Sequence, residues 1–245
     1  MFDTIKDEIL QEVKELVGED FEGIYVDIAN IEKQDYNYRV FLDAALTRTL
    51  SLGENYRLGG GASKIVIIPK CADYVIKIPI TGTYITKQDE NGNEVRELEG
   101  HVDLTEFDHL EREQSIYQIL NSGSKKVFLP NITVGEINDI PIYIQEKVEK
   151  TFGQINDPAE KFESSMNSAK KIVSQTSYGS QDGIDALDDA FIAAIVEYYG
   201  EDVARQVIVD AGDIGDLHED NYGFTVDGRP VIFDYADFFC EMYCY

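Results

Sequence analysis

Three polar residues near the end of the sequence have types and a spacing that suit metal-dependent chemistry. Asp216 and Asn221 are five positions apart in a polar loop. Asp234 follows the apolar run Val231-Ile232-Phe233. Carboxylate and amide oxygens are hard ligands that suit Mg²⁺. Because Asp and Asn also favour turns, the first two residues alone are a weak signal, and Asp234 at the end of a strand strengthens it.

A hairpin is the element that would bring these residues together. Residues 221–226 and 230–235 predict two strands joined by a tight turn at Asp227-Gly228. The second strand would direct the Asp234 carboxylate back toward the loop that precedes the first strand. The sequence therefore predicts one cluster of oxygen ligands at this end of the hairpin.

A second group of candidate residues lies in the first half of the chain. Residues 58–66 read LGGGASKIV, and residues 74–80 read YVIKIPI with Lys77 at the centre. Three glycines are often only a loop, but these are flanked by predicted strands. A lysine within an apolar strand is costly to bury unless it is paired. Taken alone, Lys77 is better explained as a charge on an edge strand.

The other elements follow from apolar periodicity and turn residues. They are a helix over 4–17 with Thr4 and Asp7 as a capping box and Gly18 as its stop, a hairpin over 83–98 turning at Asn91-Gly92, a helix over 105–120, strands over 125–137 and 140–148, and helices over 158–173, 185–200 and 201–212. Residues 19–55 give no clear element. The fold class is α+β, divided into 1–55, a β-rich part 56–149 and a mainly helical part 150–245.

Composition limits the partners. The chain has 47 acidic and 21 basic residues, a formal net charge of −26. Such a surface repels nucleic acid and anionic membranes, and it also favours solubility. The three cysteines form no metal-type spacing, and neither a secretory signal nor a membrane-spanning run is visible. These features predict a cytoplasmic protein without a membrane or nucleic-acid partner.

The C-terminal residues resemble the catalytic core of the protein-kinase-like superfamily. Asp216-Leu217-x-x-x-Asn221 matches the D-L-x-x-x-N of the catalytic loop, and Asp234 matches the Asp of D-F-G. Ile214 stands where H-R-D has its His, and Gly215 and Tyr235-Ala236 are closer to small-molecule kinases of the aminoglycoside and choline type. The sequence has no A-P-E, and eleven residues follow Asp234. These departures leave the acceptor open.

The first half continues the resemblance in the required order. Residues 58–66 are similar to the glycine-rich loop, with Lys64 at the third glycine, and Val75-Ile76-Lys77 is similar to V-A-I-K. Residues 142–148 look like the strand and hinge that hold adenine through backbone groups. The resemblance covers about residues 56–240 and implies a bilobal fold, with a β-rich N-lobe, one key helix and a minimal helical C-lobe.

The resemblance also implies a role for each residue. Asp216 would orient the acceptor hydroxyl and accept its proton, and Lys77, fixed by Glu113 or by the alternative Glu111, would hold the ATP phosphates. Asn221 and Asp234 would bind Mg²⁺. The residues implied to bind ATP are Gly59, Gly61, Ala62, Lys64, Val66, Lys77, Glu146 and Val148.

Three functions remain open at this level. The first is an ATP- and Mg²⁺-dependent phosphotransferase acting on a hydroxyl of a protein or a small molecule. The second is a pseudokinase that binds the nucleotide without transfer. The third is an acidic interaction protein that keeps only the fold. Taken alone, Glu113 is better explained as a solvated helix residue.

Overall fold

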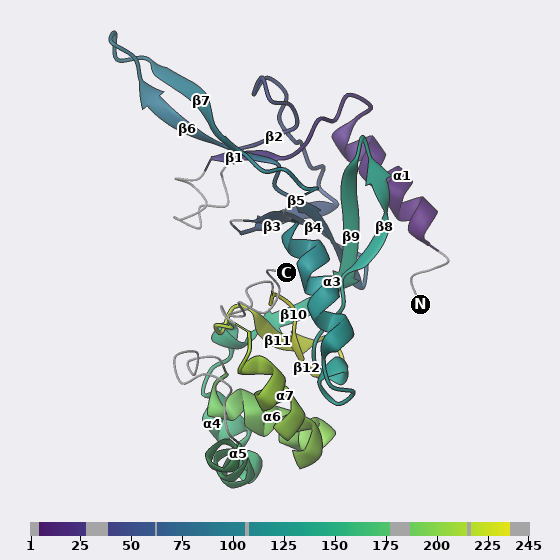
Figure 1. Ribbon diagram of the computed structural model, residues 1–245, viewed down its shortest axis with the longest axis vertical. Helices are drawn as coiled ribbons and strands as arrows, with labels where there is room; N and C mark the ends of the chain where they lie inside the picture. Colours follow the sequence, from purple (N-terminus) through teal and green to yellow (C-terminus); the bar gives the residue numbers. More distant parts are fainter. Residues whose placement is uncertain are drawn as a thin grey trace. The chain divides into compact units, whose positions relative to one another are not determined.

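The computed structural model describes residues 5–27, 39–61, 63–105, 108–176, 187–214 and 217–235, and these form a mixed α+β protein (Figure 1). The chain divides into two compact units. The first unit comprises Met1–Leu110 and Asn131–Gln145, and the second comprises Glu111–Pro130 and Glu146–Tyr245. Segment 1–55, expected as an extension, thus belongs to the first unit.

The centre of the first unit is a five-stranded sheet with the strand order β3-β4-β5-β9-β8. Its strands are β3 (Tyr56–Gly60), β4 (Lys64–Pro69), β5 (Tyr74–Pro79), β8 (Ile132–Ile137) and β9 (Ile140–Glu146). The predicted strands around the glycine-rich segment are confirmed, but the strand predicted over 125–137 begins only at Ile132, because Ser124–Lys126 is a 3₁₀ helix. The strand predicted over 140–148 ends at Glu146. Side chains alternate between the two faces of a strand, and the fully buried Ile65, Ile67, Ile76 and Ile78 belong to one apolar core.

Helix α1 (Lys6–Val17) contributes to this isoleucine core through Ile9, Val13 and Val17. The helix ends at Gly18, as predicted, with φ of 82°. The predicted capping box is wrong, because the N-cap is Ile5 and no side chain caps the helix; Thr4 lies outside the described residues. The helix also approaches β8 closely, since a Cβ on Gly135 would lie 2.7 Å from Leu10 Cδ2.

A second sheet in the first unit was not predicted as a sheet. Its order is β2-β1-β6-β7, built from β1 (Tyr25–Asp27), β2 (Val40–Phe41), β6 (Gly82–Gln88) and β7 (Glu94–His101). The predicted hairpin of β6 and β7 is confirmed, and Gly92 has the expected positive φ, 80°. The strands β1 and β2 come from the part of the sequence that gave no clear element.

The second unit is mainly helical around one three-stranded sheet. It contains the 3₁₀ helices η2 (Ser124–Lys126) and η3 (Phe152–Gln154), helices α4 (Pro158–Lys161), α5 (Glu163–Gln175), α6 (Asp189–Tyr199) and α7 (Glu201–Ala211), and strands β10 (Val148–Thr151), β11 (Tyr222–Thr225) and β12 (Pro230–Ile232). Helix α3 (His109–Ile119) begins in the first unit and continues into the second. The helix predicted over 158–173 is broken at Phe162. No helix of the described ranges is long and apolar enough to cross a bilayer.

Two tyrosines attach α1 to the five-stranded sheet and give a pH-dependent prediction. The Tyr56 and Tyr74 hydroxyls donate to the two oxygens of Glu12, at 2.7 and 3.3 Å. The hydrogen bond to Glu12, then burial, raises the pKa of Tyr56 to about 12, whereas burial comes first for Tyr74, whose pKa is also raised to about 12. A phenol with a raised pKa stabilises the fold below its unfolded value of about 10, and this contribution is lost as the pH rises from there to about 12.

We therefore expect Glu12→Gln to lower the pKa of Tyr56 more than that of Tyr74. Phenolate absorbance, compared with Tyr56→Phe and Tyr74→Phe backgrounds, measures each pKa. Equal displacement of both values would show that the Glu12 hydrogen bond does not dominate at Tyr56.

Candidate functional site

One face of the five-stranded sheet carries the predicted nucleotide-binding residues of the first unit. Gly59 pairs with Val66, and Val66 pairs with Lys77, so the three residues form a row across β3, β4 and β5. Lys64 is two residues before Val66 and shares its face. Because Ile65, Ile67, Ile76 and Ile78 occupy the isoleucine core, the row and Lys64 belong to the opposite face.

Lys77 does not lie on an edge strand. It is only 2% exposed and stands in β5, the central strand of the sheet. Lys64 is also buried, at 4% exposure. Each has at least one bonding or electrostatic interaction, as a buried cation requires. Two buried lysines thus share one face of the sheet, in a chain whose net charge is −26.

The glycine-rich segment forms the turn between β3 and β4. The Gly61 N–H donates to the Lys64 carbonyl oxygen at 3.0 Å, which closes the turn. A Cβ on Gly61 would have no neighbour within 4 Å among the described atoms. The backbone there is open to a ligand, and Ala62 lies outside the described residues.

In the second unit the two predicted metal ligands, Asn221 and Asp234, belong to the two chain segments at the base of a hairpin. Tyr222 pairs with Ile232 across β11 and β12, and the Phe233 N–H donates to the Asn221 carbonyl oxygen at 3.0 Å. Asp234 is the next residue. The predicted hairpin is confirmed, with Gly228 at φ 84° in its turn. Asn221 and Asp234 are therefore neighbours across the base of the hairpin, and Asn221 is buried.

Tyr235 connects this pair to helix α3. Its hydroxyl donates to the Leu129 carbonyl oxygen at 2.7 Å, and its ring packs edge-on against Phe128 with centroids 5.1 Å apart. Burial, and next the Glu113 carboxylate, raises the pKa of Tyr235 well above its usual value, with smaller contributions from Tyr117 and Asp234. Glu113 and Asp234 thus both act on the same phenol.

Glu113 is not a solvated helix residue. It is 0% exposed, whereas the alternative Glu111 is exposed. The start of α3 is fixed within the first unit by Asp108, which accepts from the Leu110 N–H at 2.8 Å and from the Tyr143 hydroxyl at 2.5 Å. Glu113 engages in at least one bonding or electrostatic interaction. Its burial favours it over Glu111 as the carboxylate of the site.

A close backbone approach fixes the strand that begins beside Asn221. A Cβ on Gly223 would lie 2.1 Å from the Lys150 carbonyl oxygen and 2.9 Å from Thr151 Cα. Real Cβ atoms do not come so close, so β10 and β11 would have to separate.

We expect Gly223→Ala to destabilise the protein by about 1–3 kcal/mol through overpacking. Thermal unfolding measures this loss. Gly53→Ala is the matched control, because a Cβ there meets nothing within 4 Å, and equal effects of the two substitutions would contradict the steric explanation.

The predicted hinge residues have partners that sequence reasoning missed. The Glu146 carboxylate accepts a hydrogen bond from Arg229, whose Nε also donates to Asp227 at 3.1 Å. Val148 pairs with Thr225 in the sheet of the second unit. The Glu146 side chain is thus already engaged, so only backbone groups of this segment are candidates for an adenine contact. The sequence signal for this contact was Arg229, a basic residue directly after the Asp227-Gly228 turn.

The candidate residues fall into two groups. Gly59, Gly61, Lys64, Val66 and Lys77 belong to the first unit, and Glu113, Glu146, Val148, Asn221 and Asp234 belong to the second. Asp216 lies outside the described residues, and the pairing of Lys77 with Glu113 stays a prediction. Within the described ranges, no three His, Cys, Asp or Glu side chains form a metal-binding group. Asn221 and Asp234 stay predicted ligands, and Asp216 lies beyond the described part.

Comparison with known proteins gives no match: no family model fits the sequence, and no curated protein and no solved structure is significantly similar.

Proposed function

We propose that the chain is an ATP- and Mg²⁺-dependent phosphotransferase of the protein-kinase-like superfamily, which transfers the γ-phosphoryl group to a hydroxyl acceptor. The observation that carries the proposal is the base of the β11–β12 hairpin. There the Phe233–Asn221 hydrogen bond sets Asn221 beside Asp234, and Asp234 and Glu113 act on one buried phenol. The backbone contact and the shared effect on Tyr235 support the grouping of three residues that were chosen from sequence motifs alone.

The two buried lysines of the first unit support the same function. Lys77 is in the third strand, in chain order, of the five-stranded sheet, and the turn between the first two strands is the glycine-rich segment. A lysine on the third strand and a glycine-rich loop covering the phosphates are the arrangement used by protein kinases. Lys64 and Lys77 would supply positive charge to a triphosphate that the acidic exterior otherwise repels.

The division of the chain supports the bilobal arrangement that the proposal needs. The boundary between Gln145 and Glu146 falls within the expected hinge, residues 142–148. In the proposal, the first unit is the N-lobe with α1 and the second sheet added to it, and the second unit is the C-lobe.

Each candidate residue has a separate role in the proposed reaction. Asn221 and Asp234 would hold Mg²⁺, for which amide and carboxylate oxygens are suitable ligands. Mg²⁺ bound there would neutralise part of the negative charge on the phosphates. Lys77, oriented by Glu113, would hold the phosphates, and backbone N–H groups near Gly61 would cover them. Asp216 would orient the acceptor hydroxyl and accept its proton, so catalysis would rest on positioning and electrostatics.

The decisive variant is Asp216→Ala. We expect it to keep the thermal stabilisation by Mg-ATP and to lose ATP turnover by about 10²–10⁴-fold, the range for removal of a general base. The measurements are thermal unfolding with and without Mg-ATP, and release or transfer of the γ-phosphoryl group. Absence of any Mg-ATP stabilisation in the unsubstituted protein would refute the proposal and favour the acidic interaction module.

A second function, nucleotide binding without transfer, is favoured by one observation. Ile214, where the kinase pattern has a His, is buried in the apolar core of the second unit. An isoleucine cannot donate a hydrogen bond to the catalytic loop. Stabilisation by Mg-ATP without turnover, in both the unsubstituted protein and Asp216→Ala, would support nucleotide binding without transfer.

A further inference from the structure

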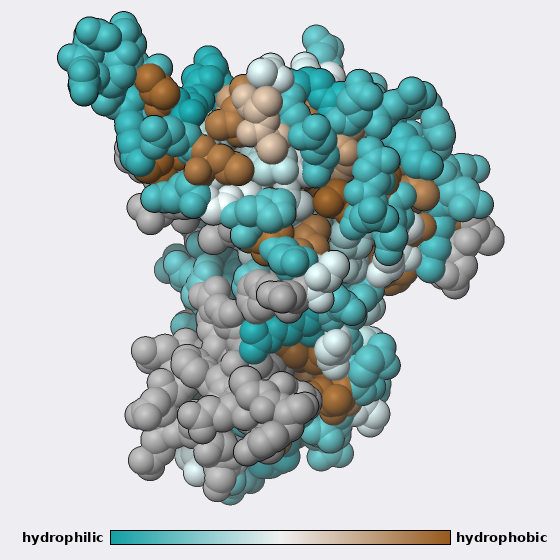
Figure 2. Space-filling model, turned by 45° about the horizontal axis from the view of Figure 1, so that its top comes forward, coloured by the Kyte–Doolittle hydropathy of each residue, from teal (hydrophilic) through white to brown (hydrophobic). Residues whose placement is uncertain are grey.

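The hairpin of β6 and β7 has an exposed outer edge. Strand β7 is the last strand of its sheet, and none of the described strands pairs with its outer side. Residues 94–99 are all exposed, and the strand contains neither Pro nor Lys, two residues that commonly protect sheet edges. Figure 2 shows the hairpin at upper left as a largely hydrophilic projection with apolar side chains at its surface.

Charge on this edge selects the kind of strand that could pair with it. Glu94, Glu97 and Glu99 are exposed on β7, and Arg96 is its only Lys or Arg residue. Like charges directly opposite each other destabilise a strand pair, so two copies of β7 would repel each other. A strand rich in Lys or Arg would instead place opposite charges side by side.

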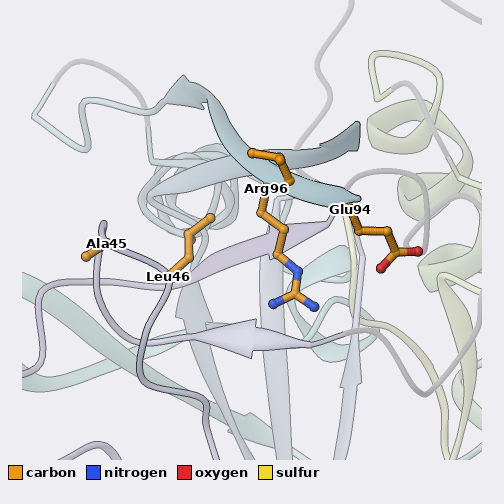
Figure 3. Close-up of a pocket in the computed structure, with 5 residues that line it drawn as sticks. Ala45, Leu46, Glu94 and Arg96 are labelled. Carbon is orange, nitrogen blue, oxygen red and sulfur yellow. The ribbon is translucent and has the colours of Figure 1, made fainter. Parts of the chain in front are cut away.

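Apolar contacts are available on the same strand. Val95 and Leu98 are 40% and 42% exposed. An open pocket of about 410 Å³ lies beside the start of β7. It is lined by Ala45, Leu46, Glu94, Val95 and Arg96. Figure 3 shows Leu46 and Arg96 side by side at this pocket; Leu46 comes from the loop after β2 and Arg96 from β7.

One lining residue of the pocket, Arg96, packs over a buried aromatic ring. The Arg96 guanidinium lies 5.5 Å from the centroid of the Phe41 ring, and Phe41 packs edge-on against Tyr84 at 5.2 Å. Phe41 and Tyr84 are buried, with Tyr25, in a small core of their own. Arg96 thus lies over this aromatic core while remaining exposed, and the three glutamates outnumber it among the charges of β7.

We propose that β7 is a docking edge for an extended, positively charged peptide segment of a partner protein, which adds as a further strand. Main-chain hydrogen bonds would supply the affinity, and alternate side chains would supply the specificity. An apolar side chain would enter the pocket, and Lys or Arg side chains would face Glu97 and Glu99. This surface is independent of the proposed phosphotransferase activity.

A defined probe tests this proposal. The probe is an eight-residue peptide of alternating Lys and Val with blocked ends, compared with the same peptide methylated at every backbone nitrogen. We expect the first peptide to bind at physiological salt and to slow amide hydrogen exchange within 94–99. The methylated peptide keeps the charges but cannot donate strand hydrogen bonds, so it should not bind.

Matched charge variants separate the edge from the general acidity of the chain. Glu97→Lys with Glu99→Lys should weaken binding about tenfold, through repulsion of opposed like charges. Glu54→Lys with Asp73→Lys changes the net charge equally at other exposed sites and should leave affinity nearly unchanged. Because Glu97 also pairs with Lys87 at 2.9 Å, the milder Glu97→Gln with Glu99→Gln provides a second, smaller loss. No binding of the unmodified peptide, equal binding of the methylated one, or equal loss in both charge-reversal variants would overturn the proposal.

Discussion

Replacing Lys77 with Met will abolish the stabilisation by Mg-ATP and lower the rate of phosphoryl transfer by about 10²–10³-fold, the usual effect of removing one preorganised electrostatic donor. The ammonium group is buried in the central strand of its sheet, on the face opposite the isoleucine core. In water-poor surroundings such a charge interacts strongly with phosphate oxygens. Methionine fills the same volume and keeps the strand apolar, so the loss would concern charge alone.

The stability of the unliganded protein distinguishes this effect from misfolding. Replacing a buried ion pair by a well-packed apolar residue is often neutral, but removing one partner leaves the other charge uncompensated. If Glu113 is that partner, Lys77→Met should destabilise the protein, and adding Glu113→Gln should recover part of the loss. Lys70→Met, at an exposed position, is the matched control. Unchanged Mg-ATP stabilisation in Lys77→Met would refute the role of this lysine.

The sequence predicted the local elements of the site well because each is coded by short-range signals. The turns at Asn91-Gly92 and Asp227-Gly228 and the stop at Gly18 each depend on a residue that tolerates positive φ. In YVIKIPI, side chains alternate between the two faces of the strand, so Ile76 and Ile78 share one face and Lys77 lies on the other. The burial of Glu113 also had a signal: Leu110, Glu113 and Ile116 recur at every third position, and all three are buried.

The features that could not be predicted from the sequence depend on contacts between residues far apart in the chain. Strand β1 has three residues and β2 has two, too short for any periodicity, and β1 forms part of a sheet by pairing with β6 more than fifty residues away. The break at Phe162 is also tertiary, because its ring stacks on Phe224 at 5.7 Å and joins the core of the second unit. The Glu146–Arg229 contact likewise joins residues far apart in sequence.

Asp234→Asn will remove the Mg²⁺-dependent part of nucleotide binding while leaving the fold intact. The substitution keeps the size of the side chain but replaces an anionic oxygen, the stronger ligand for Mg²⁺, with a neutral amide. Asp234 is half-buried at the base of the hairpin, where the backbone contact between Phe233 and Asn221 does not involve its side chain. Thermal unfolding without ligand measures what the substitution costs the fold, including the interaction that Asp234 already makes, and the additional stabilisation that Mg²⁺ gives over ATP alone should disappear.

The aspartate in the turn of the same hairpin provides the control. Asp227 accepts hydrogen bonds from Thr225 and Arg229, and the bond from Thr225 is the main cause of its lowered pKa. Asp227→Asn should reduce stability at neutral pH, because a carboxylate with a lowered pKa stabilises the fold above its unfolded value and loses this effect only as the pH falls. It should leave the response to Mg²⁺ unchanged. Binding of Mn²⁺, followed by the paramagnetic resonance of the free ion, measures metal binding without turnover. If Asp234→Asn and Asp227→Asn bound Mn²⁺ equally well in the presence of ATP, the metal would have to be held elsewhere. The assignment of Asn221 and Asp234 as its ligands would then be wrong.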